Sequence, residues 1–454
     1  MAVTPPPRSV HIIGAGGVGM SGLALLLKRN GAEITASDKK DSPYLRKLAE
    51  KGIRTWVGSQ PENIPQGAHV YYSTAIKPED PERQFAEQQG FRCEPRHSLL
   101  RHVTADYFTI AIAGCHGKTT TSAWVADLLT RAGIDPTALI GGTVPAWNSN
   151  YREGEGQREG KRILVIEADE SDRSFLSIAA DVALITNVDL DHTDIHPSLE
   201  SLENDFCEFA LTARKNQGWI HLSTECAGRI AGILNDEEKL LRAGITISHE
   251  KHSISAQGRE YAIGLAGAHN LMNATLVLQL GLKFGIAPET IAASLSGFSG
   301  VNRRMQRLAE FPEKNLTVID DYAHHPHEVA ATLAALEPQY ERLMIFWEPH
   351  RLSRFTHFHA EFAAVLEPYA LQHSLFSLPI YASGDKAADY PEAVELFRRF
   401  ETQPFQHIAS AAAFSLRQLA LDGRKSAAVF MGAGASSDYA KAFSEFLKNS
   451  QQNG

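Results

Sequence analysis

The 454-residue sequence has few cysteines, no long apolar run and no recognisable targeting segment. Its cysteines are Cys93, Cys115, Cys207 and Cys226. They form no CxxC pair, which argues against a zinc signature or a disulfide framework and fits a reducing cytoplasm. No run of about 18 apolar residues occurs, so we expect no membrane insertion. The first ten residues lack the apolar core of a signal peptide, and we expect a cytoplasmic protein.

An excess of basic residues is also missing. The chain carries 44 Lys+Arg against 53 Asp+Glu, a net charge of −9. Nucleic-acid binding requires a basic face, so we expect no nucleic-acid partner. This balance still allows a local basic pocket for an anionic small molecule. Hydrophobic residues make up 43% of the chain and charged residues 21%, which is typical of a globular protein with a packed core.

Strands and helices alternate along the chain in three successive cycles, a pattern typical of α/β proteins with parallel sheets. The strands predicted to open the cycles are Val10–Ile13, Phe108–Ala113 and Leu316–Ile319. We expect three domains, spanning residues 1–105, 106–302 and 303–454. Within the second domain, the polar stretch Asn148–Lys161 is predicted to be a surface loop.

A glycine-rich turn follows the first predicted strand. Gly14, Gly16, Gly17 and Gly19 form G-x-G-x-x-G at the start of a helix. Such glycines let the backbone approach a pyrophosphate, and the helix N-terminus supplies amide donors. Asp38 ends the second strand, where a ribose-binding acid is typical. The pattern indicates a nucleotide diphosphate site of open identity, with a tight turn that binds nothing as the alternative.

A second glycine-rich loop opens the second cycle. The sequence Gly-Cys-His-Gly-Lys-Thr-Thr-Thr at 114–121 lies between a predicted strand and a predicted helix. In a P-loop, the lysine reaches the β- and γ-phosphates of a nucleotide and the next hydroxyl binds Mg²⁺. Ile112 stands where the full motif has its first glycine, so this is a shortened variant.

Acidic residues end two neighbouring strands of the second domain. Glu167-Ala168-Asp169-Glu170 follows one strand, and Asp189-Leu190-Asp191-His192 follows the next. Ligands bind at the carboxyl ends of strands in α/β sheets, and Mg²⁺ prefers oxygen ligands and phosphate. These residues therefore indicate a magnesium site. Solvation or helix capping is the alternative for Glu170, Asp172 and Asp194.

Polar clusters also mark later strand ends and helix starts. His269, Asn270 and Asn273 open a helix, where they could bind a base edge or simply cap the helix. The third domain contains Arg303-Arg304, the segment Asp320-Asp321-Tyr322-Ala323-His324-His325-Pro326, Pro349-His350-Arg351 and Arg354. Arginines can pair with a phosphate or a substrate carboxylate. Two such clusters after neighbouring strands favour a site over isolated structural histidines.

The order of these motifs along the whole chain resembles the Mur ligase family, the ATP-dependent amide ligases of peptidoglycan precursor assembly. The glycine-rich start, Gly-Cys-His-Gly-Lys-Thr, Glu-Ala-Asp-Glu-Ser-Asp, Asp-Tyr-Ala-His-His-Pro and Pro-His-Arg carry the resemblance. It is strongest to the members that join L-alanine to UDP-N-acetylmuramate. Cys115 replaces a usual threonine and Ala323 a usual glycine; both are small, so we expect tolerance. We also expect thiol reagents to reach Cys115 in the phosphate loop.

The resemblance implies a Rossmann-like N-terminal domain, a P-loop ATPase-like central domain and a Rossmann-like C-terminal domain. It implies that UDP-N-acetylmuramate is bound by Gly14, Gly16, Gly17, Gly19, Ser37, Asp38, Ser73 and Thr74. It implies an ATP site formed by Gly114, His116, Gly117, Lys118, Thr119, Thr120, His269, Asn270, Asn273, Arg304 and Asp320. The implied ligands of Mg²⁺, which Mn²⁺ can replace, are Thr119, Glu167 and His192.

By the same resemblance, L-alanine is bound by Tyr322, His324, Arg351 and Arg354. The implied catalytic residues are Lys118, His192, His324 and Arg351. The implied reaction converts the lactyl carboxylate of the sugar to an acyl phosphate, which the amine then attacks to give an amide, ADP and phosphate. The oligomeric state is expected to be a monomer or a homodimer.

Three alternatives remain at this point. One is a ligase that attaches a murein tripeptide to the same sugar nucleotide. Another is an NAD-dependent oxidoreductase, suggested by Gly14–Gly19 and Asp38 but leaving the P-loop unexplained. The third is a nucleotide-binding regulator without catalytic activity.

Overall fold

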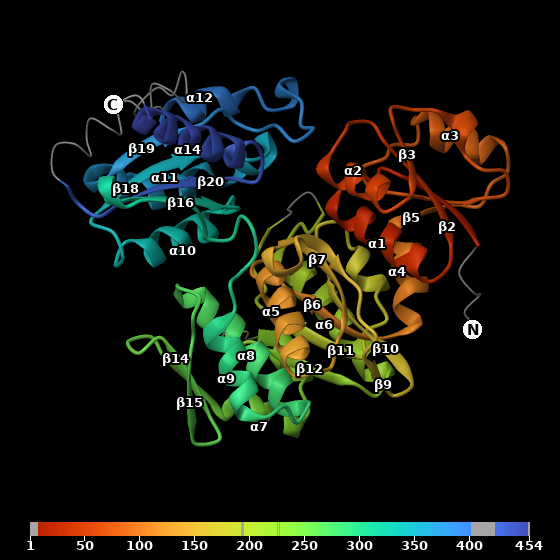
Figure 1. Ribbon diagram of the computed structural model, residues 1–454, viewed down its shortest axis with the longest axis horizontal. Helices are drawn as coiled ribbons and strands as arrows, with labels where there is room; N and C mark the ends of the chain where they lie inside the picture. Colours follow the sequence, from red (N-terminus) through yellow and green to blue (C-terminus); the bar gives the residue numbers. More distant parts are fainter. Residues whose placement is uncertain (1–7, 192–194, 225, 227, 401–422, 453–454) are drawn as a thin grey trace. The chain divides into compact units, whose positions relative to one another are not determined.

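The computed structural model describes residues 8–191, 195–224, 226, 228–400 and 423–452 (Figure 1). The chain divides into two compact units. The first consists of Met1–Leu265 with Asn270–Ser299, and the second of Ala266–His269 with Gly300–Gly454. Among the described residues, no helix combines the length and the apolar character needed to span a bilayer. His192, an expected metal-binding and catalytic residue, lies outside the described residues.

The first sheet of unit 1 is parallel, with strand order β3-β2-β1-β4-β5. Its strands are β1 (Ser9–Ile13), β2 (Glu33–Asp38), β3 (Arg54–Val57), β4 (His69–Tyr72) and β5 (Cys93–Pro95). Its helices are α1 (Val18–Arg29), α2 (Pro43–Glu50), α3 (Pro81–Gln88) and α4 (Arg96–Ala105). Chain order reverses at β1 and β4, and ligands of open α/β sheets bind beside such a reversal. The glycine-rich turn after β1 lies at this point.

The second sheet of unit 1 has the order β12-β11-β6-β10-β7-β8. Its strands are β6 (Tyr107–Ala113), β7 (Thr137–Val144), β8 (Ser149–Arg152), β9 (Gln157–Arg158, paired with β10), β10 (Lys161–Glu167), β11 (Val182–Ile185) and β12 (Trp219–Leu222). Strand β6 is buried along its whole length. A continuous apolar run of this kind is typical of a central parallel strand covered on both faces.

Helices and a small hairpin sheet complete unit 1. The helices are α5 (Lys118–Arg131), α6 (Leu199–Lys215), α7 (Asp236–Ala243), α8 (Ala268–Lys283) and α9 (Pro288–Gly297). The antiparallel strands are β13 (Ile245–Ser248), β14 (Ser253–Ala256) and β15 (Arg259–Ala262). Short 3-10 helices in the two units lie at Pro61–Asn63, Pro145–Trp147, Ser174–Ser177, Gly228–Ile233, Pro312–Lys314 and Ala387–Asp389.

The stretch Asn148–Lys161 is only in part the surface loop that its polarity predicts, since residues 153–156 and 159–160 lie outside strands. It contains β8, antiparallel to β7, and β9, antiparallel to β10. Asn150 and Tyr151 in β8 are buried. The Asn150 side-chain amide donates to the backbone carbonyl of Val18 at the start of α1, 2.7 Å away. For β8 the prediction was wrong because these side chains are buried by a helix about 130 residues earlier, which local polarity cannot indicate.

Helix α1 joins the two sheets of unit 1 into one core. Leu26 and Leu27 of this helix belong to the same buried cluster as Leu139 of β7. A Cβ at Gly22 would lie 2.8 Å from the Leu139 Cδ2 atom, so the helix approaches β7 closely. At the end of the helix, Arg29 donates to the Thr137 hydroxyl at 2.6 Å. The sheets therefore share apolar and polar contacts across the first domain boundary that the sequence predicts.

Unit 2 contains one mixed sheet, with order β16-β17-β20-β18-β19 (Figure 1, cyan to blue). Its strands are β16 (Gln306–Phe311, antiparallel), β17 (Leu316–Asp321), β18 (Arg342–Trp347), β19 (Ser374–Ser377) and β20 (Ser426–Met431). Its helices are α10 (Pro326–Leu336), α11 (Leu352–Gln372), α12 (Glu392–Arg398) and α14 (Ser436–Gln452).

Alternation along β18 gives this sheet two separate cores. Met344 and Phe346 pack with Phe443 and Leu447 of α14 on one face. The neighbouring residues of β18 face a second cluster, which contains residues of α10, α11 and α12. Side chains of successive strand residues point to opposite faces, so one apolar strand supplies both cores. This layering leaves the strand ends to carry the polar residues.

We predict that Phe346→Ala destabilises the protein by about 3–5 kcal/mol, because it removes a fully buried ring and leaves a cavity. The Phe346 ring stacks on Phe430 at 4.2 Å and on Phe376 at 4.6 Å between centroids. The shift in urea midpoint, followed by circular dichroism, measures the effect. Leu371→Ala is the control, since that side chain is 89% exposed and its loss should change stability by about 0.5 kcal/mol or less. Equal shifts in the two variants would contradict the prediction.

Candidate active site

The glycine-rich turn after β1 is folded back onto the end of β2. The backbone amides of Gly14 and Ala15 both donate to the Ser37 carbonyl at 2.9 Å. A Cβ at Gly14 would lie 3.0 Å from the Ser73 Cβ after β4. In contrast, a Cβ at Gly17, the N-cap of α1, would meet nothing within 4 Å. The turn is therefore packed on its inner side and open where the helix begins.

Asp38 holds this turn from within the protein. Its carboxylate accepts from the Gly16 amide at 2.8 Å and from the Lys40 amide at 3.0 Å. Ser37 contacts the turn through its backbone carbonyl, while its buried side-chain hydroxyl donates to Glu82 of α3. Contact of these two side chains with a nucleoside stays a prediction, and the structure gives both of them a role in shaping the loop.

No sequence motif marks Glu82, but its buried carboxylate contacts Ser37 beside the same loop. It accepts from the Trp56 indole at 2.6 Å and from the Gln60 amide at 2.9 Å, besides the Ser37 hydroxyl. Burial alone would raise its pKa, but hydrogen bonds from its neighbours outweigh burial and lower the pKa. Glu82 is thus an ionised anchor beneath the end of β2.

Arg96 of α4 links the first sheet to the acidic loop after β10. Its guanidinium donates to the Ser174 hydroxyl at 2.9 Å and to Asp172 at 3.3 Å. Thr74, an expected sugar-nucleotide residue, also donates to Asp172, at 3.0 Å. A Cβ at Gly19 would lie 3.3 Å from the Arg96 guanidinium. The structure therefore places Gly19 and Asp172 against an arginine that sequence reasoning did not select, and Thr74 joins this group through Asp172.

The P-loop between β6 and α5 accepts only glycine at two positions. A Cβ at Gly114 would overlap the Thr186 hydroxyl after β11. Gly117 has φ +83° and packs against the Asn273 side chain of α8, so a side chain there would be both strained and obstructed. Asn273 itself donates to Asn270 at 3.2 Å. Asn273 of α8 thus lies against the loop and Asn270 contacts Asn273, whereas His269 belongs to unit 2.

Lys118, the first residue of α5, forms an ion pair inside this loop. Its Nζ atom donates to Glu170 at 2.7 Å and to the Gly114 carbonyl at 2.8 Å. Burial would lower the pKa of Lys118, but the charges of Glu170, Asp169 and Glu167 outweigh burial and raise the pKa. Burial raises the pKa of Glu170 to about 7. The lysine therefore stays charged, and its internal partner titrates near neutral pH.

Thr119 and Glu167 place oxygen atoms side by side at the start of α5. The Thr119 hydroxyl donates to Glu167 at 3.0 Å, and the other Glu167 oxygen accepts from the Gly141 amide at 2.7 Å. The following residue, Thr120, is buried. A hydroxyl and a carboxylate next to a phosphate loop are the donors that Mg²⁺ prefers. The donor set present here fits that ion.

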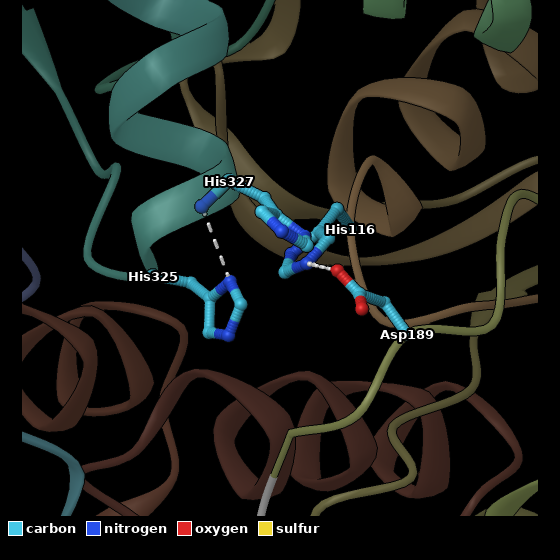
Figure 2. A group of neighbouring side chains, drawn as sticks. All are labelled: His116, Asp189, His325 and His327. Carbon is cyan, nitrogen blue, oxygen red and sulfur yellow. Dashed lines mark hydrogen bonds and ion pairs between the residues drawn. The ribbon is translucent and has the colours of Figure 1, made fainter. Parts of the chain in front are cut away.

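The loop also contacts the segment after β11. His116 Nε2 lies 3.3 Å from the Asp189 carboxylate, a pair visible in Figure 2. Cys115 Sγ donates to the Asp189 carbonyl at 2.9 Å. Cys115 is 8% exposed, and burial raises the pKa of its thiol well above the ordinary value. The expected reactivity of Cys115 is therefore not supported, because the thiolate is the reactive form.

In unit 2, expected residues cluster after β17. His324 Nδ1 lies 3.1 Å from the Glu328 carboxylate, which also pairs with Arg304 at 3.5 Å. The Arg304 guanidinium lies over the Tyr322 ring, 5.0 Å from its centroid. The backbone of α10 begins here, and Figure 2 shows the His327 amide directed at the His325 ring, 3.4 Å away. Tyr322, His324 and Arg304 are thus brought together around Glu328.

A second cluster of unit 2 follows β18. Arg354 Nη1 lies 3.5 Å from His350 Nδ1, and Arg351 pairs with Asp385 at 3.5 Å. Burial, together with His324 and the nearby arginines, lowers the pKa of His350 to about 3. This ring is therefore neutral. The His324 and His350 rings lie 5.5 Å apart, so the clusters after β17 and β18 form one site.

The loop between β20 and α14 is the third glycine-rich turn of the protein. Asp320, an expected ATP residue, accepts from the Ser437 hydroxyl of α14 at 2.7 Å. Glu348 accepts from the amides of Gly434 and Ala435, each at 2.7 Å. Sequence reasoning missed Glu348, although its place directly after β18 is the same kind of signal that selected Glu167 after β10.

Domain models of one family match the chain in succession. They are described as Mur ligase family, catalytic domain (residues 9–108), Mur ligase middle domain (residues 112–281) and Mur ligase, glutamate ligase domain (residues 303–443). The chain belongs to the Mur ligase family. This membership confirms the predicted α/β architecture of three domains, and it displaces the oxidoreductase and the non-catalytic regulator as alternatives.

Individual relatives are more specific. The UDP-N-acetylmuramate–L-alanine ligase of Nitratidesulfovibrio vulgaris is 35% identical over 395 residues, which cover 84% of this chain and 85% of that enzyme. The ligase of the same name from Desulfatibacillum aliphaticivorans is 33% identical over 426 residues, covering 89% and 90%. In fold, the chain is similar to the crystal structure of UDP-N-acetylmuramate-alanine ligase MurC from Thermotoga maritima, with TM-score 0.76, 23% identity and coverage of 97% and 99%.

We predict that Cys115 resists alkylation in the native protein, because its thiol is buried and its pKa is raised. The measurement is iodoacetamide labelling at pH 7.5, mapped by peptide mass spectrometry. Protein unfolded in urea is the control and should be labelled at Cys115. Rapid labelling of the native protein at this position would contradict the prediction.

Proposed function

We propose that this chain is an ATP-dependent ligase that joins L-alanine to the lactyl carboxylate of UDP-N-acetylmuramate in peptidoglycan precursor synthesis. The observation that carries the proposal is the P-loop in which Lys118 pairs with Glu170 while Thr119 contacts Glu167. The relatives of that name, 33–35% identical over most of the chain, support this choice of substrates. In the proposed reaction the lactyl carboxylate takes the γ-phosphoryl group of ATP, and the amine of L-alanine displaces phosphate from the acyl phosphate.

Lys118 is proposed to neutralise negative charge on the transferred phosphoryl group. Its ammonium is held close to the start of α5 by the Gly114 carbonyl, where the P-loop amides and the helix dipole also favour an anion. Before the nucleotide binds, Glu170 supplies the negative partner. When ATP binds, its phosphates therefore replace the Glu170 carboxylate as the negative partner of the Lys118 ammonium, which the protein already stabilises. Gly114, His116, Gly117, Thr120, Asn270 and Asn273 are the further contacts proposed around this nucleotide.

Thr119 and Glu167 are proposed to hold Mg²⁺, which Mn²⁺ can replace. Bound there, the ion would supply positive charge beside the phosphates. The Gly141 amide holds one Glu167 oxygen, which orients the other toward Thr119. His192 is retained as a proposed second metal ligand on the resemblance alone.

The sugar nucleotide is assigned to the turn after β1. The open start of α1 at Gly17 offers backbone amides to a diphosphate, and Gly14, Gly16 and Gly19 keep side chains away from it. Ser73 and Thr74 lie at the end of β4 on the other side of the chain reversal. Asp38 and Ser37 contribute by shaping the turn.

The amino acid is assigned to Tyr322, His324, Arg351 and Arg354 in unit 2. Arginine recognises a carboxylate with paired N–H donors, which suits the α-carboxylate of L-alanine. The low pKa of His350 keeps that ring neutral, so it adds no charge beside Arg354. His269, Arg304 and Asp320 are proposed as nucleotide contacts of this unit.

We predict that Lys118→Ala lowers the rate of phosphate release by about a thousandfold or more, because charge on the transferred phosphoryl group loses its fixed cation. The assay contains ATP, Mg²⁺ and UDP-N-acetylmuramate, with L-alanine in one arm and murein tripeptide in the other. The matched control is Lys251→Ala, in an exposed hairpin pair with Glu260, which should act like the wild type. Release with tripeptide but not L-alanine would favour the tripeptide ligase, and wild-type turnover in Lys118→Ala would reject the P-loop assignment.

We further predict that the KM for ATP falls as the pH is lowered from 8 to 6. The pKa of Glu170 is about 7, so lowering the pH neutralises the anion with which the phosphates compete for Lys118. Glu170→Gln removes that titration and should flatten the dependence of KM on pH. Steady-state kinetics at saturating amino acid and sugar nucleotide measure both enzymes. The same slope in both would show that Glu170 does not control nucleotide binding.

A further inference from the structure

A short segment after β19 holds the arginine-bearing end of α11 in unit 2. The chain turns sharply at Ala382–Asp385, where the Asp385 amide donates to the Ala382 carbonyl at 3.0 Å. The two central residues, Ser383 and Gly384, have φ of +49° and +95°. Positive φ at both central positions is the geometry of a type I′ turn, which reverses the chain within four residues. The turn directs Asp385 back toward the start of α11.

Arg351 has an uncommon backbone conformation that this segment maintains. Its φ is +64° and its ψ 130°, although it is not a glycine. The Arg351 amide donates to the Tyr381 carbonyl at 2.8 Å, and the Tyr381 amide donates to the Pro349 carbonyl at 2.9 Å. Strained conformations of this kind persist where surrounding contacts impose them, and they concentrate at functional sites. Two backbone hydrogen bonds to one neighbouring residue provide that constraint here.

Asp385 contacts the same region through its side chain. Its carboxylate accepts from the Ser353 amide at 2.9 Å, from the Ser353 hydroxyl at 2.7 Å and from the Arg351 guanidinium at 3.5 Å. The side chain is 11% exposed. Burial would raise its pKa, but the bonds from Ser353 and Arg351 outweigh burial and lower the pKa. One ionised carboxylate thus caps α11 and fixes the Arg351 side chain.

The ring of Tyr381 completes the contact with the arginine site. It stacks on His350 with centroids 5.6 Å apart and planes 8° apart. A Cβ at Gly434, in the turn after β20, would overlap the Tyr381 ring. His350 in turn lies next to Arg354. The segment therefore touches the backbone of Arg351, its side chain and the ring beside Arg354.

We infer that Asp385 is a positioning residue for the amino-acid substrate, acting through Arg351. The inference rests on the proposed function, because it assigns the Arg351 guanidinium to the substrate carboxylate. A guanidinium carries five N–H donors in a rigid fork, so a pair with Asp385 is compatible with binding a second carboxylate. By holding one side of the fork, Asp385 sets the direction in which the other donors point. A small α-amino acid depends on this direction, because its carboxylate is a large part of what the protein can recognise.

The test measures phosphate release by Asp385→Asn while L-alanine is varied at saturating ATP and UDP-N-acetylmuramate. The asparagine keeps the size of the side chain but loses its charge. We expect the KM for L-alanine to rise about tenfold or more, since a charge-assisted contact is lost. The KM values for ATP and UDP-N-acetylmuramate should stay within about twofold of the wild type, and kcat within about threefold. Asp385→Glu, which retains the charge, should recover part of the loss.

Two further variants separate positioning from helix capping. Ser353→Ala removes one bond to Asp385 but leaves the contact with Arg351, so it should lower the melting temperature and leave the KM for L-alanine unchanged. Glu367→Gln is the surface control, because Glu367 pairs only with a second exposed residue, Arg399, in the contacts described. It should change neither quantity.

The outcomes distinguish the inference from the proposed function. An unchanged KM for L-alanine in Asp385→Asn would overturn the inference, as would equal rises in KM for all three substrates. Equal effects of Asp385→Asn and Ser353→Ala on that KM would also overturn it, by making Asp385 a helix cap alone. Absence of L-alanine-dependent phosphate release by the wild type would instead reject the proposed function, and the inference with it.

Discussion

The ion pair between Lys118 and Glu170 is the constraint on which the central site depends. A cation with little solvent contact is costly unless an anion and hydrogen-bond acceptors surround it. The backbone supplies the acceptors only because the chain turns tightly after β6, and that turn requires glycine where Thr186 and Asn273 approach. Thr186, after β11, and Asn273, in α8, pack directly against this loop. Residues far apart in sequence therefore surround the loop that carries the Lys118 ammonium.

An internal carboxylate contacts each of the three glycine-rich turns. Asp38 binds an amide of the turn after β1, Glu170 binds the lysine of the turn after β6, and Glu348 binds two amides of the turn after β20. Backbone amides at such turns attract anions, and an unsatisfied one inside the protein is costly. A carboxylate of the protein thus binds the amides of the first and third turns, and another binds the lysine of the second. Glu170 contacts the lysine itself, whereas the open start of α1 at Gly17 leaves space beside Asp38.

Much of the fold and part of the site follow from the sequence because their signals are local. Apolar strands followed by glycines predict the turns after β1 and β6, and the Glu167 carboxylate at the end of β10 lies next to Thr119. Asn150, Glu82 and Asp385 could not be predicted, since each is defined by a partner from a distant segment. Polarity predicts a surface loop for Asn148–Lys161, whereas its first part is the buried strand β8, which contacts α1. Asp38 is a related case. Its spacing from the glycine-rich turn predicts a contact with ribose, whereas the contact observed is with the Gly16 amide of the turn itself.

The shared core of unit 1 also bears on the order in which the chain is made. Helix α1 packs against β7 and β8, so one apolar face of this helix is covered by residues synthesised more than a hundred positions later. A nascent chain that ends before Tyr151 exposes that face, and exposed apolar surface promotes aggregation. Contacts between distant segments also slow folding, since a long loop must close before they form. The buried contacts of α1 therefore become complete only once the segment that contains β7 and β8 has been synthesised.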